Sequence, residues 1–508
     1  MRFYLAVYSC EPIWSGCGIT TVRILFIQDN ALDESQALVE LAAFLGGQGH
    51  DCNLLLDRVE RDITASARTY DPALIIVACS MLNHWWGRDV SARLHHALKH
   101  TPIIIGGTAP TVFPELLSEA PVDGLIRGEA EVVVKAVVDH LADGNHFTSL
   151  TEVPGLFRWV DGDLVGTPAV PGMDMHSIPL ANKDIYYTRY PFMRQFPFKR
   201  FLTSRGCHHR CQYCYISTLN KVQPRQKGRK WTRRKSPEVA VAEVAREKHL
   251  GPLTHVHFSD DLFTNDKEWL FEFAPLYRRE VGIPFTCNTS AELIDDDVAE
   301  ALREAGCYSI GFAVETANAR LRNKVLRKGV KTDHLRRAAE ALHRHQVKLA
   351  TFNMLALPGE SPDEALETAR LNAQLRTDFV RLNFAFPMPG TGMSDYAIEH
   401  GFISQNWPDR FKSAEFRYTP GPQFRTPYRK EFENLFVLFR VASSNERLIP
   451  GVRRALRLNT PRSVQNVLTL QGAWNDKRNF RIPVLEGIKF FAKVGRPELR
   501  ATNFPALI

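Results

Sequence analysis

Three cysteines that lie close together are the residues of this 508-residue chain with the clearest chemical potential. Cys207, Cys211 and Cys214 stand in the segment TSRGCHHRCQYCYIS, with three residues between the first two and two residues between the last two. A loop with this spacing can wrap three thiolates around one face of a [4Fe–4S] cubane and leave one iron without a protein ligand. That open iron is the position at which a small molecule can bind and react.

Zinc is the alternative metal for these cysteines. A structural zinc site normally has four Cys or His ligands, often arranged as two Cys-x2-Cys pairs. His208 and His209 lie inside the loop and are poorly placed to complete a tetrahedron, so we expect an iron–sulfur cluster. The remaining six cysteines are scattered, and we interpret them as buried or incidental thiols: Cys10, Cys17, Cys52, Cys79, Cys287 and Cys307.

The chain before these cysteines alternates short apolar strands with amphipathic helices. The strand-like runs are VRILFIQ, DCNLLLD, PALIIVACS, PIIIGG and DGLIRG. This alternation predicts an α/β fold whose first part, residues 22–150, is a five-stranded doubly wound (flavodoxin-like) domain with helices on both faces of a parallel sheet. Residues 1–21 precede the first strand as an N-terminal arm, and an extra edge strand, a disordered segment or residues upstream of the true start all remain open.

A second alternation of strands and helices follows a boundary region. Residues 151–195 are rich in Pro, Gly and Asp, which predicts a β-hairpin and a linker. Residues 196–400 contain six strand–helix units, which predict a partial (βα)6 barrel of the TIM type with reactive groups at the carboxyl ends of its strands. The cysteine loop follows the first of these strands. The alternation then stops, and residues 401–508 are expected to form a small, basic, mostly helical C-terminal cap.

The cysteine spacing, with the aromatic Tyr213 before the third cysteine, resembles the radical S-adenosylmethionine superfamily over residues 200–400. The resemblance implies that S-adenosylmethionine chelates the open iron and that an electron from the reduced cluster cleaves it to a 5′-deoxyadenosyl radical. Three further segments resemble positions that contact this cofactor in the family: HFSDDLFTND (255–266), GFAVETANARLRNKVLRKG (311–329) and NMLALPGES (353–361).

These segments supply the candidate residues for S-adenosylmethionine, and their chemistry is suitable. Asp260 and Asp261 end a strand, where a carboxylate can accept hydrogen bonds from a cationic amino group. Glu315 also ends a strand and can hold ribose hydroxyls, and the turn from Leu357 to Gly359 lets the backbone approach an adenine closely. Ser259-Asp260-Asp261 replaces the Gly-Gly-Glu signature of the superfamily. Cobalamin-dependent relatives often carry such a variant.

The doubly wound domain resembles the cobalamin-binding domain of this cobalamin-dependent branch. The segments IIIGGTAPTVFPE (103–115) and DGLIRGEAEVVV (123–134) resemble the Gly-Gly turn and the Gly-Glu-x-Glu segment of the branch. In an open α/β sheet such loops meet at the carboxyl edge, where a flat macrocycle can bind. The resemblance implies a cobalamin site formed by Ser80, Gly106, Gly107, Gly128 and Glu129.

A histidine ligand to cobalt is not expected in this domain. The Asp-x-His-x-x-Gly signature is absent, because IQDNALDES follows the first strand. His84, beside Trp85 and Trp86, is the best placed alternative ligand, but we expect this aromatic segment to cover the corrin or the substrate instead.

Charge and hydropathy indicate the compartment and the partners. The N-terminus lacks a secretory signal and the chain has no apolar run of about 18 residues, so we expect a cytoplasmic protein without a transmembrane segment. Basic residues concentrate in two places: residues 421–508 hold 16 Lys or Arg against 6 Asp or Glu, and residues 221–235 hold eight basic residues and no acidic one. These segments are either solvated surfaces or sites that attract an anionic substrate, a reductase or a membrane surface. Nucleic acid is less favoured, because aromatic residues are not interleaved with the basic ones.

Methyl transfer to an unactivated carbon of a small-molecule or lipid-like substrate is the function that the resemblance favours. The cofactors implied are a [4Fe–4S] cluster, S-adenosylmethionine and cobalamin, with a flavodoxin or ferredoxin as the electron donor. An oxidative cyclase or rearrangement enzyme, as in the anaerobic protoporphyrin ester cyclases, would use the same cofactors without methyl transfer. A cobalamin or cluster-based sensor is a third hypothesis, but we find no output module in the sequence.

Overall fold

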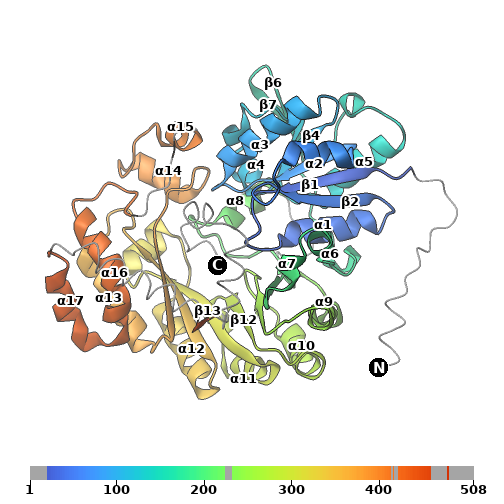
Figure 1. Ribbon diagram of the computed structural model, residues 1–508. Coiled ribbons are helices and arrows are strands. Elements are labelled where there is room, and N and C mark those ends of the chain that lie inside the picture. Colours follow the sequence, from blue (N-terminus) through green and yellow to red (C-terminus); the bar gives the residue numbers. More distant parts are fainter. Residues whose placement is uncertain (1–19, 224–231, 414–415, 417–420, 459–477, 480–508) are drawn as a thin grey trace.

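The first domain is built on a parallel sheet, as the sequence predicted. The computed structural model describes residues 20–223, 232–413, 416, 421–458, 478 and 479 (Figure 1). Five parallel strands stand in the order β2-β1-β3-β4-β5. Their bounds are β1 (Arg23–Gln28), β2 (Asp51–Leu56), β3 (Leu74–Ala78), β4 (Ile103–Gly106) and β5 (Gly124–Ile126).

Helices cover both faces of this sheet because alternate strand residues point to opposite sides. One apolar core joins Ile24 and Phe26 to helices α1 (Gln36–Gly46) and α5 (Glu131–Ala142). The other core joins Leu25 and Ile27 to the helices on the opposite face. These are α2 (Ile63–Tyr70), α3 (His84–Ala97) and α4 (Thr108–Val112). The domain is therefore doubly wound.

The sheet has seven strands rather than the five that we expected. The predicted hairpin forms as β6 (Leu156–Val160) and β7 (Asp163–Gly166), but it pairs antiparallel with β5 and extends the sheet. The helices α6 (Asp184–Tyr187) and α7 (Pro191–Arg194) follow. Tyr186 and Tyr187 of α6, Tyr190 directly before α7 and Met193 of α7 join the same apolar core as α1. The region between the two alternations is thus attached to the first sheet.

The second sheet is a curled half-barrel of six parallel strands, in agreement with the predicted partial barrel. Its order is β15-β14-β13-β12-β11-β8. The strands are β8 (Phe198–Phe201), β11 (His255–Phe258), β12 (Phe285–Thr289), β13 (Cys307–Glu315), β14 (Lys348–Leu355) and β15 (Phe379–Phe384). The covering helices are α9 (Pro237–Leu250), α10 (Lys267–Glu280), α11 (Asp296–Ala305), α12 (Thr332–Arg344) and α13 (Pro362–Gln374).

A two-stranded ribbon and one helix connect the cysteine loop to its surroundings. The ribbon pairs β9 (Ser204–Arg205) with β10 (Arg233–Arg234), and α8 (Tyr215–Val222) begins directly after Cys214. Single helical turns complete the connections: η1 (Pro114–Leu117), η2 (Phe147–Ser149), η3 (Met175–Ser177), η4 (Ala291–Leu293), η5 (Leu321–Val325, a π-turn) and η6 (Glu446–Leu448).

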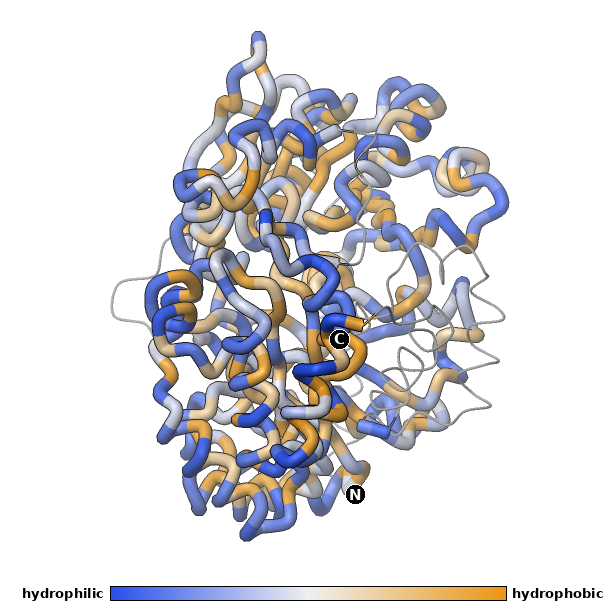
Figure 2. The backbone as a smooth tube through the Cα atoms, turned by 90° about the vertical axis from the view of Figure 1, so that its left-hand side faces the viewer, coloured by the Kyte–Doolittle hydropathy of each residue, from blue (hydrophilic) through white to orange (hydrophobic). Residues whose placement is uncertain are grey.

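The C-terminal part that the structure describes is helical. Helix α16 (Arg429–Ser444) and α17 (Ile449–Ala455) pack on α13, whereas α14 (Gly392–Glu399) and α15 (Trp407–Lys412) lie towards the first domain (Figure 1). The rest of the predicted basic cap, like residues 1–19 of the predicted arm, lies outside the described residues. Within the described ranges every helix is too short or too polar to cross a bilayer, and hydrophobic segments are short and interrupted by hydrophilic ones (Figure 2).

Candidate active site

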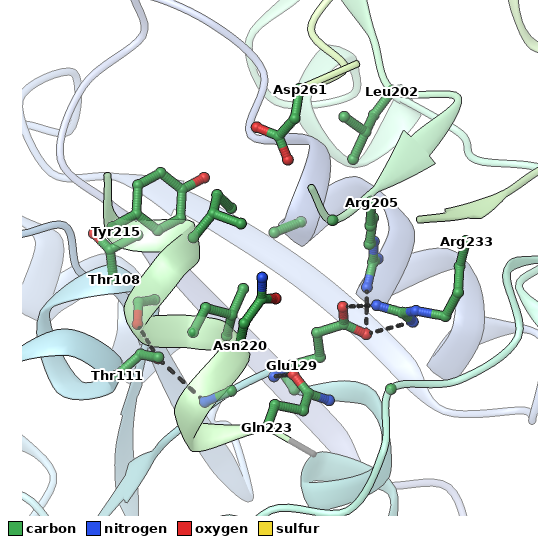
Figure 3. Close-up of a pocket in the computed structure, with 18 of the residues that line it drawn as sticks. Thr108, Thr111, Glu129, Leu202, Arg205, Tyr215, Asn220, Gln223, Arg233 and Asp261 are labelled. Carbon is green, nitrogen blue, oxygen red and sulfur yellow. Dashed lines mark hydrogen bonds and ion pairs between the residues drawn. The ribbon is translucent and has the colours of Figure 1, made fainter. Parts of the chain in front are cut away.

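A cavity of about 320 Å³ lies between the two sheets, at the carboxyl ends of strands from both of them (Figure 3). Residues after β4 and β5 form one wall, residues after β8 and β11 form another, and α8 forms a third. A parallel sheet places its ligand-binding loops at this edge, and here two such edges face one space. The residues that line the cavity include Gly107, Thr108, Thr111, Gly128, Glu129, Ser204, Arg205, Tyr215, Ile216, Leu219, Asn220, Gln223 and Asp261.

The cysteine loop lies next to α8 and is held in place by it. Cys214 is the residue that precedes the first turn of α8, and the Asn220 side chain donates a hydrogen bond to the Cys207 carbonyl oxygen at 3.0 Å. All three cysteines are free thiols, and Cys211 is buried. Burial raises the pKa of Cys207 to about 12 and that of Cys214 to about 11. These thiols are protonated without metal, so binding of iron must displace their protons.

The spacing of the cysteine sulfurs does not suit a single zinc ion. Zinc–sulfur bonds of about 2.3 Å hold tetrahedral sulfurs about 3.8 Å apart. Within the described residues, only His208, His209 and Glu292 bring three ligand atoms within 4.8 Å of one another, and the three cysteines form no such group. A cubane binds each thiolate at a separate iron and accepts wider spacing, so this donor set fits a cluster.

The two adjacent aspartates occupy different environments. Asp260 is buried and accepts hydrogen bonds from the Thr203 N–H at 3.1 Å, the Thr203 hydroxyl at 2.6 Å and the Ser204 hydroxyl. Asp261 is exposed to the cavity that it lines, where the surrounding protein atoms displace water from the carboxylate and, together with the charge of Asp260, raise its pKa to about 6 despite a hydrogen bond from the Gly206 main chain. Asp260 therefore holds the strand end, and Asp261 is the carboxylate that a ligand in the cavity can reach.

The other candidate residues for S-adenosylmethionine do not line this cavity. Glu315 ends β13 with φ of +57° and accepts a hydrogen bond from the Tyr213 hydroxyl at 2.8 Å. The Leu357 N–H donates to the Glu360 carboxylate at 3.1 Å, and Gly359 has φ of +73°. A turn of this kind needs glycine for its backbone conformation. All three lie at the carboxyl ends of β13 and β14.

The candidate cobalamin residues at the ends of β3 and β4 make contacts within the loops to which they belong. The Ser80 N–H and hydroxyl both donate to the Asn83 side chain, at 2.7 and 2.9 Å. Gly106 would tolerate a β-carbon, which would only contact Ile126 at 3.6 Å. At Gly107 (φ of +112°) a β-carbon would lie 2.4 Å from the Cys79 carbonyl oxygen. Glycine is thus required at Gly107 by the fold itself, although this residue also lines the cavity.

Gly128 and Glu129 connect the first domain to the barrel. A β-carbon at Gly128 (φ of +104°) would approach the Gln223 side chain at 3.1 Å, and the Glu129 N–H donates to that side chain at 3.0 Å. The Glu129 carboxylate forms ion pairs with Arg205, at 3.3 Å, and with Arg233 (Figure 3). The charge of Glu129 is therefore already paired within the protein.

Arg205 is the centre of a buried ion-pair network that the sequence did not indicate. It pairs with Glu131 at 2.6 Å and with Glu40, and Lys235 pairs with Glu40 at 2.7 Å and with Glu243 at 2.8 Å. Burial by itself would raise the pKa of Glu40, but Arg205 and Lys235 lower it below its ordinary value. The network joins α1 and α5 of the first domain to the β9–β10 ribbon.

This network changes the interpretation of the basic segment at 221–235. Arg233 and Lys235 are not on a solvated face, because both side chains form ion pairs inside the protein. Arg234 donates to the Leu262 and Phe263 carbonyl oxygens at 3.0 Å. Residues 224–231 lie outside the described part of the chain. The three basic residues at the end of the segment are therefore structural.

His84 lies away from the cavity. Its ring is buried and stacks on Phe411 with centroids 5.0 Å apart, and Nδ1 lies 3.0 Å from the Met81 carbonyl oxygen. Burial lowers its pKa. None of the described residues that line the cavity is a histidine.

Several lining residues were missed by the sequence interpretation. Helix α8 contributes Tyr215, Ile216, Leu219 and Asn220, and Gln223 directly follows it. Their position directly after Cys214 could have indicated them, since the first turns of such a helix must lie beside the cluster. Thr108 and Thr111 follow the Gly-Gly turn and could have been found by the same argument.

Comparison with known proteins finds one family match in the first domain and one in the barrel. Residues 34–138 match the B12 binding domain family, and residues 201–371 match the radical SAM superfamily. An uncharacterized methyltransferase of Pyrococcus horikoshii is 25% identical over 70% of this chain and 77% of its own. The cytidylyl-2-hydroxyethylphosphonate methyltransferase of Streptomyces wedmorensis is 23% identical over 70% of this chain and 72% of its own.

A solved structure has the same fold. The radical S-adenosylmethionine methyltransferase TsrM of Kitasatospora setae, with cobalamin and a [4Fe–4S] cluster bound, matches with a TM-score of 0.62 and 16% identity. The match covers 75% of this chain and 76% of that one. The cofactors of the present chain are accordingly a [4Fe–4S] cluster, S-adenosylmethionine and cobalamin. The chain belongs to the cobalamin-dependent radical S-adenosylmethionine enzymes, which join an N-terminal B12 binding domain to a radical SAM barrel.

Proposed function

We propose that this enzyme transfers a methyl group to an unactivated carbon of a small molecule. The cavity carries the proposal, because the carboxyl edges of the B12 binding domain and of the radical SAM barrel border one space beside the cysteine loop. A substrate in that space can meet both cofactors without moving between sites. The two relatives named as methyltransferases support this reaction over cyclisation.

Cys207, Cys211 and Cys214 are the proposed ligands of the cluster. Their free thiols and their spacing support this assignment. Asp261 is the proposed partner of the S-adenosylmethionine amino group, because it is the aspartate of the pair that lines the cavity. We assign Asp260 to holding the strand end, and we retain Glu315, Leu357 and Gly359 as contacts for the nucleoside part of the cofactor.

Cobalamin is proposed to lie against the edge of the first sheet, after β4 and β5. Gly107, Thr108, Thr111 and Gly128 border the cavity there and present little side-chain bulk to a flat ring. The paired carboxylate of Glu129 positions this edge against the barrel instead of contacting the corrin. Because no described lining residue is a histidine, we propose that cobalt has no histidine ligand from the protein.

When bound, the cluster and S-adenosylmethionine supply a carbon radical that removes a substrate hydrogen, and cobalamin supplies the methyl group. One C–H bond, two molecules of S-adenosylmethionine and two electrons give one C–CH₃ bond, S-adenosylhomocysteine, 5′-deoxyadenosine and methionine. A protein donor such as flavodoxin or ferredoxin would supply the electrons. The residues of the chain orient the reactants, and the apolar side chains of Ile216 and Leu219 exclude water from part of the cavity.

The substrate is proposed to be a small or lipid-like molecule. An anionic group is supported by the phosphonate in the name of the Streptomyces wedmorensis relative. The basic segment at 221–235 supports it less than the sequence suggested, since Arg233 and Lys235 are paired internally.

Product analysis tests the proposed function. The anaerobically reconstituted full-length enzyme is incubated with S-adenosylmethionine, a chemical reductant and a pool of small-molecule metabolites. Methyl transfer predicts S-adenosylhomocysteine together with 5′-deoxyadenosine. Formation of 5′-deoxyadenosine alone, with consumption of a metabolite that gains no methyl group, would favour the oxidative cyclase or rearrangement enzyme instead.

A further inference from the structure

The cysteine loop is fastened to a segment of the barrel that follows β13. The Gln212 N–H donates to the Leu326 carbonyl oxygen at 2.9 Å, and the Met393 N–H donates to the Gln212 carbonyl oxygen at 3.1 Å. The residue between Gln212 and Cys214 is Tyr213, which is enclosed by protein. The side chain of Tyr213 therefore has a fixed position between the second and third cysteines.

A buried chain of polar groups passes through the Tyr213 hydroxyl. This hydroxyl donates to the Glu315 carboxylate at 2.8 Å and accepts a hydrogen bond from the Lys328 ammonium group at 3.3 Å. Lys328 is only 8% exposed and Glu315 only 4%. A lysine buried to this degree is uncommon unless its charge is used or paired.

The Lys328 ammonium group lies beside the cysteine loop. It contacts the hydroxyl of Tyr213, the residue directly before Cys214. The main chain at Leu326, two residues before Lys328, is hydrogen-bonded to Gln212, the residue directly after Cys211. A cation that stabilises a thiolate through a protein interior also stabilises added negative charge on a cluster held by that thiolate. The reduction potential of an iron–sulfur cluster depends on such local charge.

We propose that Lys328, held by Tyr213 and Glu315, is a positioning residue that raises the reduction potential of the cluster by stabilising its reduced form. This inference rests on the proposed cysteine ligands. Reduction adds one electron to the cluster, and the buried ammonium group that contacts Tyr213 offsets that charge. The effect on the reduction potential is present before S-adenosylmethionine binds, because Lys328, Tyr213 and Glu315 are all groups of the protein.

The test is a redox titration of the reconstituted full-length enzyme without S-adenosylmethionine, followed by electron paramagnetic resonance of the reduced cluster. Lys328→Met removes the charge, and we expect a more negative potential. Lys328→Gln also removes the charge but keeps a donor for the Tyr213 hydroxyl, and it should show the same shift. Lys328→Arg keeps the charge and should stay close to the wild type.

Lys324→Met is the matched control. Lys324 lies in the same segment as Lys328 but is exposed, so its charge is screened by solvent and its loss should leave the potential unchanged. Unchanged potentials in Lys328→Met and Lys328→Gln, with weaker binding of S-adenosylmethionine, would overturn the proposal and make Lys328 a contact for that cofactor. Loss of the cluster in both variants would also overturn it, since the role would then be structural. Failure of the cysteines as ligands would appear separately, as a wild-type enzyme without the cluster signal.

Discussion

Replacing Arg205 by methionine should lower the free energy of unfolding, because it removes ion pairs that join the first domain to the β9–β10 ribbon. The Arg205 side chain is 13% exposed and forms ion pairs with three glutamates of the first domain, at 3.3 Å for Glu129, at 2.6 Å for Glu131, and with Glu40. Methionine has a similar length and keeps the apolar part of the contact. The variant therefore tests the charge of Arg205 rather than its volume.

The expected loss follows from what remains after the substitution. Glu40 and Glu131 are only 1% and 4% exposed, so both would stay buried with one partner fewer. Removing one member of a buried ion pair costs about 3–5 kcal/mol, because the other charge is left uncompensated. Lys235 still pairs with Glu40 at 2.7 Å, which favours the lower end of this range.

Chemical denaturation of the cofactor-free full-length protein measures this loss, with Arg344→Met as the control. Arg344 also pairs with a carboxylate, Asp296, at 2.7 Å, but both side chains are more than half exposed. Exposed pairs contribute about 0.2–1 kcal/mol. If Arg205→Met lowered the free energy of unfolding by no more than Arg344→Met does, the ion-pair network would not couple the domains as we argue.

Three further predictions concern acid stability, cofactor binding and the cobalt ligand. Burial would raise the pKa of Glu34, but the charges of Lys199 and Lys183 lower it to about 2. Glu34 therefore stabilises the fold above its unfolded pKa of 4.5, and this stability is lost as the pH falls towards 2. Replacing Glu34 by Gln should reduce the change in the free energy of unfolding over this pH range by roughly 3 kcal/mol. Asp261→Asn should weaken S-adenosylmethionine binding about 10- to 100-fold in a binding titration, as expected for loss of a hydrogen bond between charged groups, with little loss of stability. Asp260→Asn should instead lower the free energy of unfolding by about 1–3 kcal/mol. Equal effects of the two changes would refute the separate roles of the two aspartates. Electron paramagnetic resonance of the Co(II) form should show cobalt lines without nitrogen splitting, and splitting that vanishes in His84→Ala would make His84 the ligand.

The sequence predicted the first sheet well because most of its strands are continuous apolar runs. Ile103 to Ile105, for example, form a fully buried stretch that fits a strand covered on both faces. The hairpin of β6 and β7 was predicted, but its pairing with β5 was not. Strand β6 lies between β5 and the edge strand β7, and its side chains are mostly half-buried, a pattern that does not indicate which strand will pair with it.

The contacts between the domains could not be predicted from the sequence. Strands β9 and β10 have two residues each and are separated by 27 residues, so they have no periodicity to detect. Arg233 and Lys235 resembled part of a solvated basic segment, because a run of charges does not reveal which carboxylates will fold against it. The different roles of Asp260 and Asp261 depend in the same way on the hydroxyl donors Thr203, between β8 and β9, and Ser204 of β9.

We propose that one cavity serves both cofactors, and a magnetic interaction between the cluster and the cobalt would report their proximity. The electron paramagnetic resonance signal of Co(II) cobalamin is recorded in the full-length enzyme with the cluster oxidised and with the cluster reduced. We predict that reduction of the cluster broadens the cobalt signal and speeds its relaxation. The effect should be absent in the triple variant Cys207→Ala, Cys211→Ala, Cys214→Ala, which should retain the corrinoid. A cobalt signal that is the same with oxidised and reduced cluster would place the cofactors far apart and contradict the claim.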